Sequence, residues 1–215
     1  FRFKGGDRLK LRGLTVEKTL PRYLADEEWG KILVTAQRPL FDRNFPEYAR
    51  KRAKLELALI YIFCSSLRLS EGISLKIKDL EEGYLRVMGK GSKEKLVPIE
   101  GPVMQAIHDY RFSRRDNGPY LFPGKKPGTH MARRTAEDII KKLCRRAGFP
   151  DVSVHTFRHT AATQLLKLGA TLRDIQEVMG HESIETTKLY THIVQGDLAR
   201  KLPKRFGPHN QGKLD

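Results

Sequence analysis

The feature that most constrains this chain is an apolar run from Leu57 to Cys64 (LALIYIFC) inside a longer helix-like segment. Together with Leu55 and Leu67 it gives a wide apolar face, which predicts a long helix with Pro46 in its first turn. The run is far too short to cross a bilayer, and its position in mid-chain does not suit a signal peptide. We therefore expect a globular domain in which this helix is central and buried.

The rest of the chain reads as further helices, interrupted by one change of hydrophobic period. Two short strands, over residues 84–88 and 95–99, flank the turn-forming residues Gly89 to Ser92, which predicts a β-hairpin. The other helices are expected over residues 26–37, 69–75, 102–113, 135–147, 155–168, 171–179, 183–192 and 195–202. Gly148 and Gly169 are expected to end two of them, and Thr171 is expected to cap another together with Asp174. The predicted fold class is mainly α with a small antiparallel β-sheet, an α+β fold.

The charge balance favours a polyanionic partner. The 215 residues carry 41 Lys and Arg against 25 Asp and Glu, a formal net charge of +16. This excess favours nucleic acid. It favours an anionic membrane surface less, because no basic amphipathic helix with a bulky apolar face is evident. A basic protein from a charge-rich proteome is the plain alternative.

The two cysteines indicate the redox environment of the chain rather than a catalytic role, and its ends indicate the domain boundaries. Cys64 and Cys144 lie in apolar helical stretches without ligand-like neighbours, so we expect reduced core thiols in a reducing compartment. Residues 1–19 read as a basic arm or linker, 20–197 as one domain, and 198–215 as a C-terminal helix and basic tail. The chain begins at Phe1, and we expect an N-terminal portion of a longer protein to precede it.

Two segments place cations beside structural breaks. Arg68, in SLRLSE, follows directly on the most apolar helix, where a guanidinium is costly to bury unless it meets an anion. An i,i+3 pair with Glu71 on a helix surface explains it equally well. Lys90 lies at the hairpin tip, where an ammonium can reach a phosphate or donate a proton. Lys93 and Lys95 are nearby, and a solvated turn lysine remains the alternative.

A third segment, HTFRHT, combines His155 and Arg158 on one helix face, where they can hold the same oxyanion. The position of His155 near a helix N-terminus also suits phosphate. His155 and His159 are four apart, as in some metal sites. However, the glutamate of the HExxH motif is absent and a cation lies between the two histidines, so we expect no zinc.

The fourth segment contains His181, in the corner after Gly180, and Tyr190 on the next expected helix. For a single tyrosine, an ordinary half-buried aromatic is the default interpretation. The joint set is two arginines, a lysine, two histidines and a tyrosine, without clustered carboxylates. It indicates that cationic side chains stabilise charge on a phosphoryl group, so no metal or other cofactor is expected.

Taken together, these segments resemble the tyrosine recombinase (phage integrase/Xer) family over about residues 20–205. The matching elements are Arg68 in LRLSE, Lys90 in GKGSKEKLVPI, His155 and Arg158 as HxxR, and Gly180-His181 with Tyr190 nine residues after His181. The sequence departs from the family at Ser65-Ser66, where Thr-Gly or Ser-Gly is common. Such recombinases usually also carry an N-terminal core-binding helical domain, which is not among these 215 residues, so we expect them to be a C-terminal catalytic domain or a truncated product.

The resemblance implies that residues 20–197 have the tyrosine recombinase catalytic-domain fold, and it assigns a role to each matched residue. Tyr190 would attack the scissile phosphate, forming a 3′-phosphotyrosyl link and releasing a 5′-hydroxyl. Because free tyrosine has a pKa of about 10, it needs nearby cations or a base. His155 would assist removal of its proton, and Lys90 would be general acid to the leaving 5′-oxygen.

The remaining matched residues would bind the phosphate. Arg68 and Arg158 would hold its non-bridging oxygens, and His181 would add a hydrogen bond there. Glu71 would support Arg68 from behind.

The implied function is a site-specific DNA recombinase or integrase that works without metal or ATP. Two alternatives stay open: a type IB topoisomerase-like DNA relaxase and a DNA-binding module that has lost catalysis.

The expected partner is double-stranded DNA. We expect a homotetramer on paired sites, and a monomer in solution is left open. No membrane partner is expected. The expected location is the cytoplasm, in a prokaryote or encoded by a prokaryotic virus or plasmid. The tail over 198–215 either docks onto a neighbouring protomer, as in the family, or is disordered.

Overall fold

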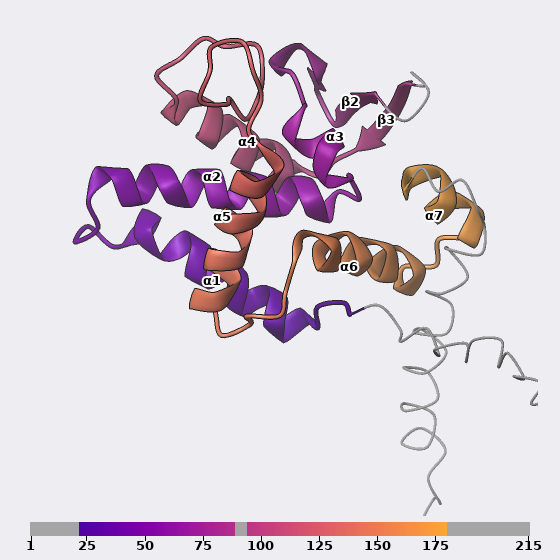
Figure 1. Ribbon diagram of the computed structural model, residues 1–215. Coiled ribbons are helices and arrows are strands. Elements are labelled where there is room, and N and C mark those ends of the chain that lie inside the picture. The colour runs from indigo at the N-terminus through magenta and orange to yellow at the C-terminus, as the bar shows by residue number, and fades with distance from the viewer. Residues whose placement is uncertain (1–21, 89–93, 180–215) are drawn as a thin grey trace, which may run out of the picture.

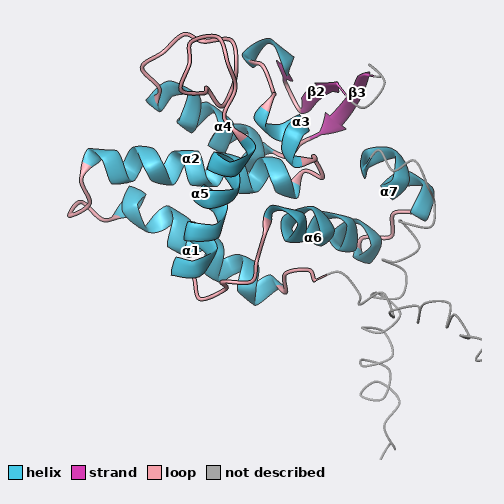
Figure 2. Cartoon of the chain, viewed as in Figure 1, coloured by secondary structure: helices cyan, strands magenta, loops and turns pink. Residues whose placement is uncertain are grey.

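The computed structural model describes residues 22–88 and 94–179. Within these ranges it contains seven α-helices and a three-stranded sheet at one corner of the molecule (Figures 1 and 2). The elements in chain order are α1 Asp26–Phe41, α2 Glu47–Cys64, α3 Leu69–Ile73, the 3-10 turn η1 Ile77–Asp79, β1 Leu80–Glu81, β2 Tyr84–Met88, β3 Glu94–Pro98, α4 Gly101–Ser113, α5 Arg133–Arg146, α6 Val154–Lys167 and α7 Leu172–Met179. The predicted α+β class with a small antiparallel sheet is confirmed.

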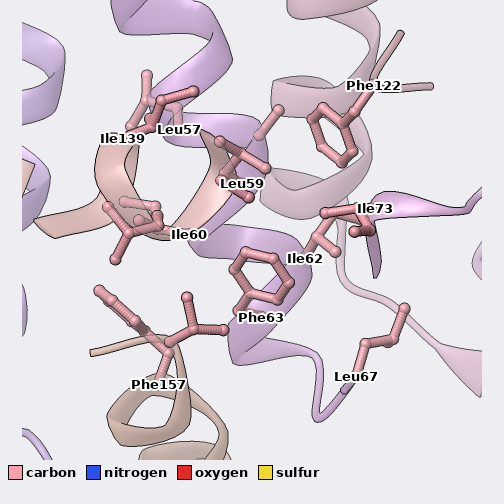
Figure 3. Packing of buried hydrophobic residues seen from close by; sticks show 14 of the residues in the cluster. Leu57, Leu59, Ile60, Ile62, Phe63, Leu67, Ile73, Phe122, Ile139 and Phe157 are labelled. Carbon is pink, nitrogen blue, oxygen red and sulfur yellow. The ribbon is translucent and has the colours of Figure 1, made fainter. Parts of the chain in front are cut away.

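Helix α2 is the centre of the core, as its apolar run predicted. It packs against α1, α4, α5 and α6. Its residues Leu59, Ile60, Ile62 and Phe63 have no exposed surface. Figure 3 shows this cluster, in which α2 meets side chains from three other helices: Ile73 of α3, Ile139 of α5 and Phe157 of α6. None of the helices in the described ranges combines the length and hydropathy that a bilayer crossing requires.

Several helix boundaries differ slightly from the prediction. Helix α1 continues past residue 37 to Phe41, with Pro39 in its last turn. A proline near the end of a helix removes only one backbone donor, and its fixed φ is compatible with helical backbone. Pro46 is the N-cap of α2 and lies just before its first turn. The short helix α3 ends at Ile73 and does not reach residue 75.

The starts of α4, α5 and α6 lie one or two residues before the predicted positions. Helices α5 and α6 end one residue before the predicted positions, and the glycine expected to end each helix follows it: Gly148 and Gly169 have φ of +91° and +94°. At the start of α7, the predicted pairing of Thr171 with Asp174 is present. The Asp174 backbone N–H donates to Thr171 Oγ1 over 3.2 Å, and the Thr171 N–H donates to Asp174 Oδ2 over 2.8 Å.

The sheet contains the predicted hairpin and one strand that was not predicted. The strand order is β1-β2-β3, with antiparallel pairing throughout. Strand β1 has only two residues, too few to show a periodic pattern. Strand β3 begins and ends one residue before the predicted range. The turn over 89–93 and the helices predicted over 183–192 and 195–202 lie outside the described residues, as do the predicted domain boundaries.

Helix α3 lies very close to the end of α2, and Gly72 permits this approach. A Cβ atom at Gly72 would come within 2.8 Å of Phe63 Cε1 and 2.9 Å of Ile62 Cγ2, closer than side chains tolerate. The close approach holds the first turn of α3, which carries Arg68 and Glu71, against the core helix.

Candidate active site

Arg68 is the N-cap of α3 and is paired with Glu71. Its Nη1 lies 2.9 Å from Glu71 Oε1, and its backbone N–H donates to Glu71 Oε2 over 2.8 Å. The i,i+3 pair expected for an ordinary helix surface is therefore present. However, the Glu71 side chain is only 6% exposed while that of Arg68 is 38% exposed. A buried carboxylate thus orients a guanidinium whose outer part reaches the surface.

Arg158 lies on α6 and is almost completely buried, with 7% of its surface exposed. Its Nη1 donates to the carbonyl oxygen of Ser66, and its Nη2 donates to the carbonyl oxygen of Met179 over 2.6 Å. The guanidinium therefore joins the turn after α2 to the end of α7. Since Ser66 is two residues before Arg68 in the chain, the same turn leads directly to Arg68.

The histidines of the HTFRHT motif differ in their exposure. His155 is the second residue of α6 and is exposed, near the helix N-terminus as predicted. His159 is partly buried one turn later. Burial, and then the neighbouring His155 and Arg158, lower the pKa of His159 to about 4. His159 is therefore neutral at neutral pH, which limits the positive charge that the motif carries.

Lys95 is a further cation of the site, although the sequence indicated it only as a neighbour of Lys90. It lies on β3 with its Nζ 3.4 Å from Glu71 Oε2. Burial lowers the pKa of Lys95 and the Glu71 carboxylate raises it, while the positive charges of Arg158 and Arg68 lower it again; the net shift is downward. Lys95 thus shares the Glu71 carboxylate with Arg68 and is close enough to Arg158 for the charge of that arginine to act on it.

Glu71 remains ionised in this position although it is buried. Burial raises its pKa, but the backbone N–H of Arg68 and the charges of Lys95 and Arg68 outweigh that effect and hold the pKa below its ordinary value. An ionised Glu71 can bind two cations at once. The arrangement suits the binding of a further anion at the surface of the cluster, because the three cations exceed the single buried carboxylate in charge.

The other three predicted site residues, Lys90, His181 and Tyr190, lie outside the described residues. The structure therefore brings together Arg68, Arg158 and Glu71 of the predicted set, places His155 on the same helix as Arg158, and adds Lys95. In the part of the chain that the structure describes, no three His, Cys, Asp or Glu side chains gather as metal ligands would.

Comparison with known proteins bears directly on the predicted resemblance. The model of the phage integrase family matches residues 22–196. The chain belongs to the phage integrase family. This phage integrase domain is 35% identical over 201 residues to tyrosine recombinase XerA of Pyrococcus furiosus, covering 90% of the chain and 65% of the relative. It is 38% identical over 192 residues to tyrosine recombinase XerC of Natranaerobius thermophilus, covering 83% and 60%. The chain thus spans just under two thirds of these prokaryotic relatives.

Solved structures confirm that the phage integrase domain has the tyrosine recombinase catalytic-domain fold. A crystal structure of XerA recombinase superposes with a TM-score of 0.68 at 27% identity, covering 89% of this chain and 66% of that one. A post-cleavage complex of XerH site-specific recombinase bound to a palindromic difH substrate gives a TM-score of 0.70 at 26% identity, covering 86% and 53%.

Proposed function

We propose that this domain cleaves and rejoins DNA strands as a site-specific tyrosine recombinase, through a 3′-phosphotyrosyl intermediate. The observation that carries the proposal is the position of two arginines from distant parts of the sequence. Arg158 binds the carbonyl of Ser66 in the turn that leads into Arg68, and Arg68 is oriented by buried Glu71. Two guanidinium groups in this relation suit the non-bridging oxygens of one phosphate.

In the proposed reaction, the phenolic oxygen of Tyr190 attacks the scissile phosphorus while the bond from phosphorus to the 5′-oxygen breaks. His155 assists removal of the phenolic proton, and Lys90 gives a proton to the departing 5′-oxygen. Arg68, Arg158 and His181 stabilise the charge on the phosphoryl oxygens. Since the phosphotyrosyl bond conserves the energy of the broken phosphodiester, a 5′-hydroxyl can reverse the step without ATP.

The proposed partner is double-stranded DNA. The net charge of +16 supports this partner, as does the substrate named in the XerH complex. Exchange between two duplexes requires four strand cleavages, so we propose that four protomers assemble on paired sites. The substrate would place the protein in the cytoplasm of a prokaryotic cell.

The test is covalent trapping on nicked duplexes that carry candidate sites, because loss of the short strand beyond the nick prevents religation. We expect the wild-type chain to form an adduct that survives denaturing electrophoresis, and Tyr190→Phe to form none. Tyr48→Phe is the matched control, since Tyr48 is a 77% exposed tyrosine on α2. DNA binding without an adduct by the wild-type chain contradicts the proposed chemistry. An adduct formed by Tyr190→Phe contradicts the choice of nucleophile.

A relaxation assay separates the recombinase from a type IB topoisomerase. The compact spacing of His181 and Tyr190 and the GKGSKEKLVP hairpin favour the recombinase. We therefore expect supercoiled plasmid without a recombination site to stay supercoiled. Rapid relaxation of such plasmid would favour the topoisomerase.

A further inference from the structure

Lys95 lies on the buried face of the sheet, where an apolar residue is expected. It is directly opposite Val87 in the β2–β3 ladder, and directly opposed residues share one face of an antiparallel sheet. That face also holds Leu85 and Val97, both buried. The Lys95 side chain is 19% exposed, whereas neighbouring Leu96 points outward and is 55% exposed. In β3, therefore, a lysine takes an inward position and a leucine takes the outward position next to it, the reverse of the usual pattern.

This inward lysine reaches one particular acceptor. Of the two carboxylate oxygens of Glu71, Oε1 accepts from Arg68 Nη1. Oε2 accepts from the Arg68 backbone N–H over 2.8 Å and from Lys95 Nζ over 3.4 Å. Glu71 thus links strand β3 to the N-cap residue of α3. Movement of the hairpin at Lys95 would be transmitted to the carboxylate that orients Arg68.

Stability alone does not explain a cation at this position. Burial lowers the pKa of Lys95, and the charges of Arg158 and Arg68 lower it further against the opposing effect of Glu71, so the site disfavours the ammonium overall. Replacing a partly buried ion pair by apolar side chains of similar volume is often neutral or stabilising. A residue that breaks the strand pattern without a gain in stability is expected where function requires it.

We propose that Lys95 is a positioning residue of the cleavage site, which holds Glu71 Oε2 and thereby fixes the Arg68 guanidinium and couples the β2–β3 hairpin to it. The inference rests on the proposed function, since its consequence is a correctly oriented Arg68 at the scissile phosphate. It assigns Lys95 no proton transfer.

The first test compares Lys95→Met and Lys95→Arg with the wild-type chain in the trapping assay. Methionine fits the apolar face and Arg68 still pairs with Glu71, but the buried carboxylate loses one of its cations, so we expect a modest fall in Tm. The rate of adduct formation should fall about 10- to 100-fold, as is typical when an outer partner of a functional group is removed. Arginine keeps the ion pair with Glu71 and should restore most of the rate. DNA affinity should change little, which places the loss in the rate of cleavage.

Arg86→Met is the matched control. It removes one positive charge from the outer face of the same sheet, where Arg86 pairs with Glu81 and Glu94. We expect it to cleave at the wild-type rate. An active Lys95→Met variant, or an equal loss in Arg86→Met, overturns the proposal.

A substrate with sulfur in place of the bridging 5′-oxygen separates positioning from proton donation, because a thiolate leaves without a general acid. Lys95→Met should remain slow on this substrate. Restoration of its rate overturns the proposal, since Lys95 would then be the proton donor.

A readout without DNA keeps this inference separate from the proposed function. The Arg68 backbone N–H donates to the same Glu71 oxygen that Lys95 contacts. We expect its hydrogen exchange to be faster in Lys95→Met and unchanged in Arg86→Met. Unchanged exchange in Lys95→Met overturns the coupling, whether or not the wild-type chain cleaves DNA. Altered exchange without a wild-type adduct would instead contradict the proposed function.

Discussion

Arg158 Nη2 donates a 2.6 Å hydrogen bond to the carbonyl oxygen of Met179, the last residue of α7. The carbonyl groups at the end of a helix lack partners within the helix, and a cation there also interacts favourably with the helix dipole. The guanidinium of Arg158 therefore donates a hydrogen bond to a carbonyl group at the end of α7 and another to the turn after α2. The next two residues in the sequence are Gly180 and His181.

Replacing Arg158 by lysine should impair cleavage and stability together. A lysine ammonium cannot span both carbonyl oxygens in the way that a planar guanidinium does. We expect adduct formation to fall at least about 100-fold and the free energy of unfolding to fall by about 1–3 kcal/mol. Urea denaturation and the trapping assay measure the two effects. Arg173→Lys, at an exposed position of α7, is the control. A fully active Arg158→Lys variant would remove Arg158 from the proposed phosphate site.

The low pKa of His159 predicts a dependence of stability on pH. Its pKa is about 4 in the folded chain, against about 6.5 in an unfolded one. Below pH 6.5 the unfolded state binds a proton that the folded state does not, so this contribution is complete above about pH 6.5 and is lost between about pH 6.5 and 4. His159→Gln should therefore lose fewer degrees of Tm than the wild type on acidification to about pH 5.

The control for this experiment is His108→Gln, at an exposed position of α4. Its Tm should follow the wild-type curve as the pH falls. Parallel pH profiles for wild type and His159→Gln would contradict the assignment of a neutral, partly buried imidazole.

The buried carboxylate of Glu56 is expected to be structural. Glu56 is 1% exposed and binds Arg52 Nε at 3.0 Å and Arg146 Nη2 at 2.7 Å, joining α2 to α5. Glu56→Gln should lower the free energy of unfolding by about 1–3 kcal/mol, because hydrogen bonds to charged groups are lost in a buried position. Cleavage rates should not change. Glu47→Gln, which breaks the exposed pair with Lys51, should leave the midpoint of the same urea titration nearly unchanged.

Removal of divalent metal should leave cleavage intact. The positive charge of Arg68 and Arg158, the proposed ligands of the phosphate, can stabilise the phosphoryl oxygens as Mg²⁺ does in metal-dependent nucleases. We expect the rate of adduct formation in EDTA to lie within about twofold of the rate in Mg²⁺. A Mg²⁺-dependent nuclease on the same duplex shows that chelation is complete. Strong inhibition of adduct formation by this chain would contradict the proposed catalysis by side-chain cations.

The parts of the fold that could be predicted are those in which one segment carries its own signal. The apolar run in α2 predicted the central helix, and Gly148 and Gly169 predicted where α5 and α6 end. Strand β1 was missed because two residues carry no period, and α1 continues past its predicted end at residue 37 to Phe41.

In the candidate site, too, the features that could be predicted are those that depend on a single segment. Spacing in the sequence was enough to pair Arg68 with Glu71 and to place His155 at a helix start. The contact of Lys95 with Glu71 depends on how β3 docks against α3, which no local pattern records. The inverted order of Lys95 and Leu96 in β3 is the one signal that could have indicated it. The roles of Lys90, His181 and Tyr190 stay predictions.

Ser66 is the only non-glycine residue with positive φ in the described ranges, at +67°. It follows the C-cap of α2, where glycine is the usual residue because a side chain in this backbone region costs about 1–2 kcal/mol. Many members of the family have glycine there, and a glycine adopts this turn without help. In this chain the carbonyl of the same residue is held by Arg158. The evolutionary consequence is that serine makes Arg158 harder to replace, since its loss would release the strained turn as well as remove the proposed phosphate ligand.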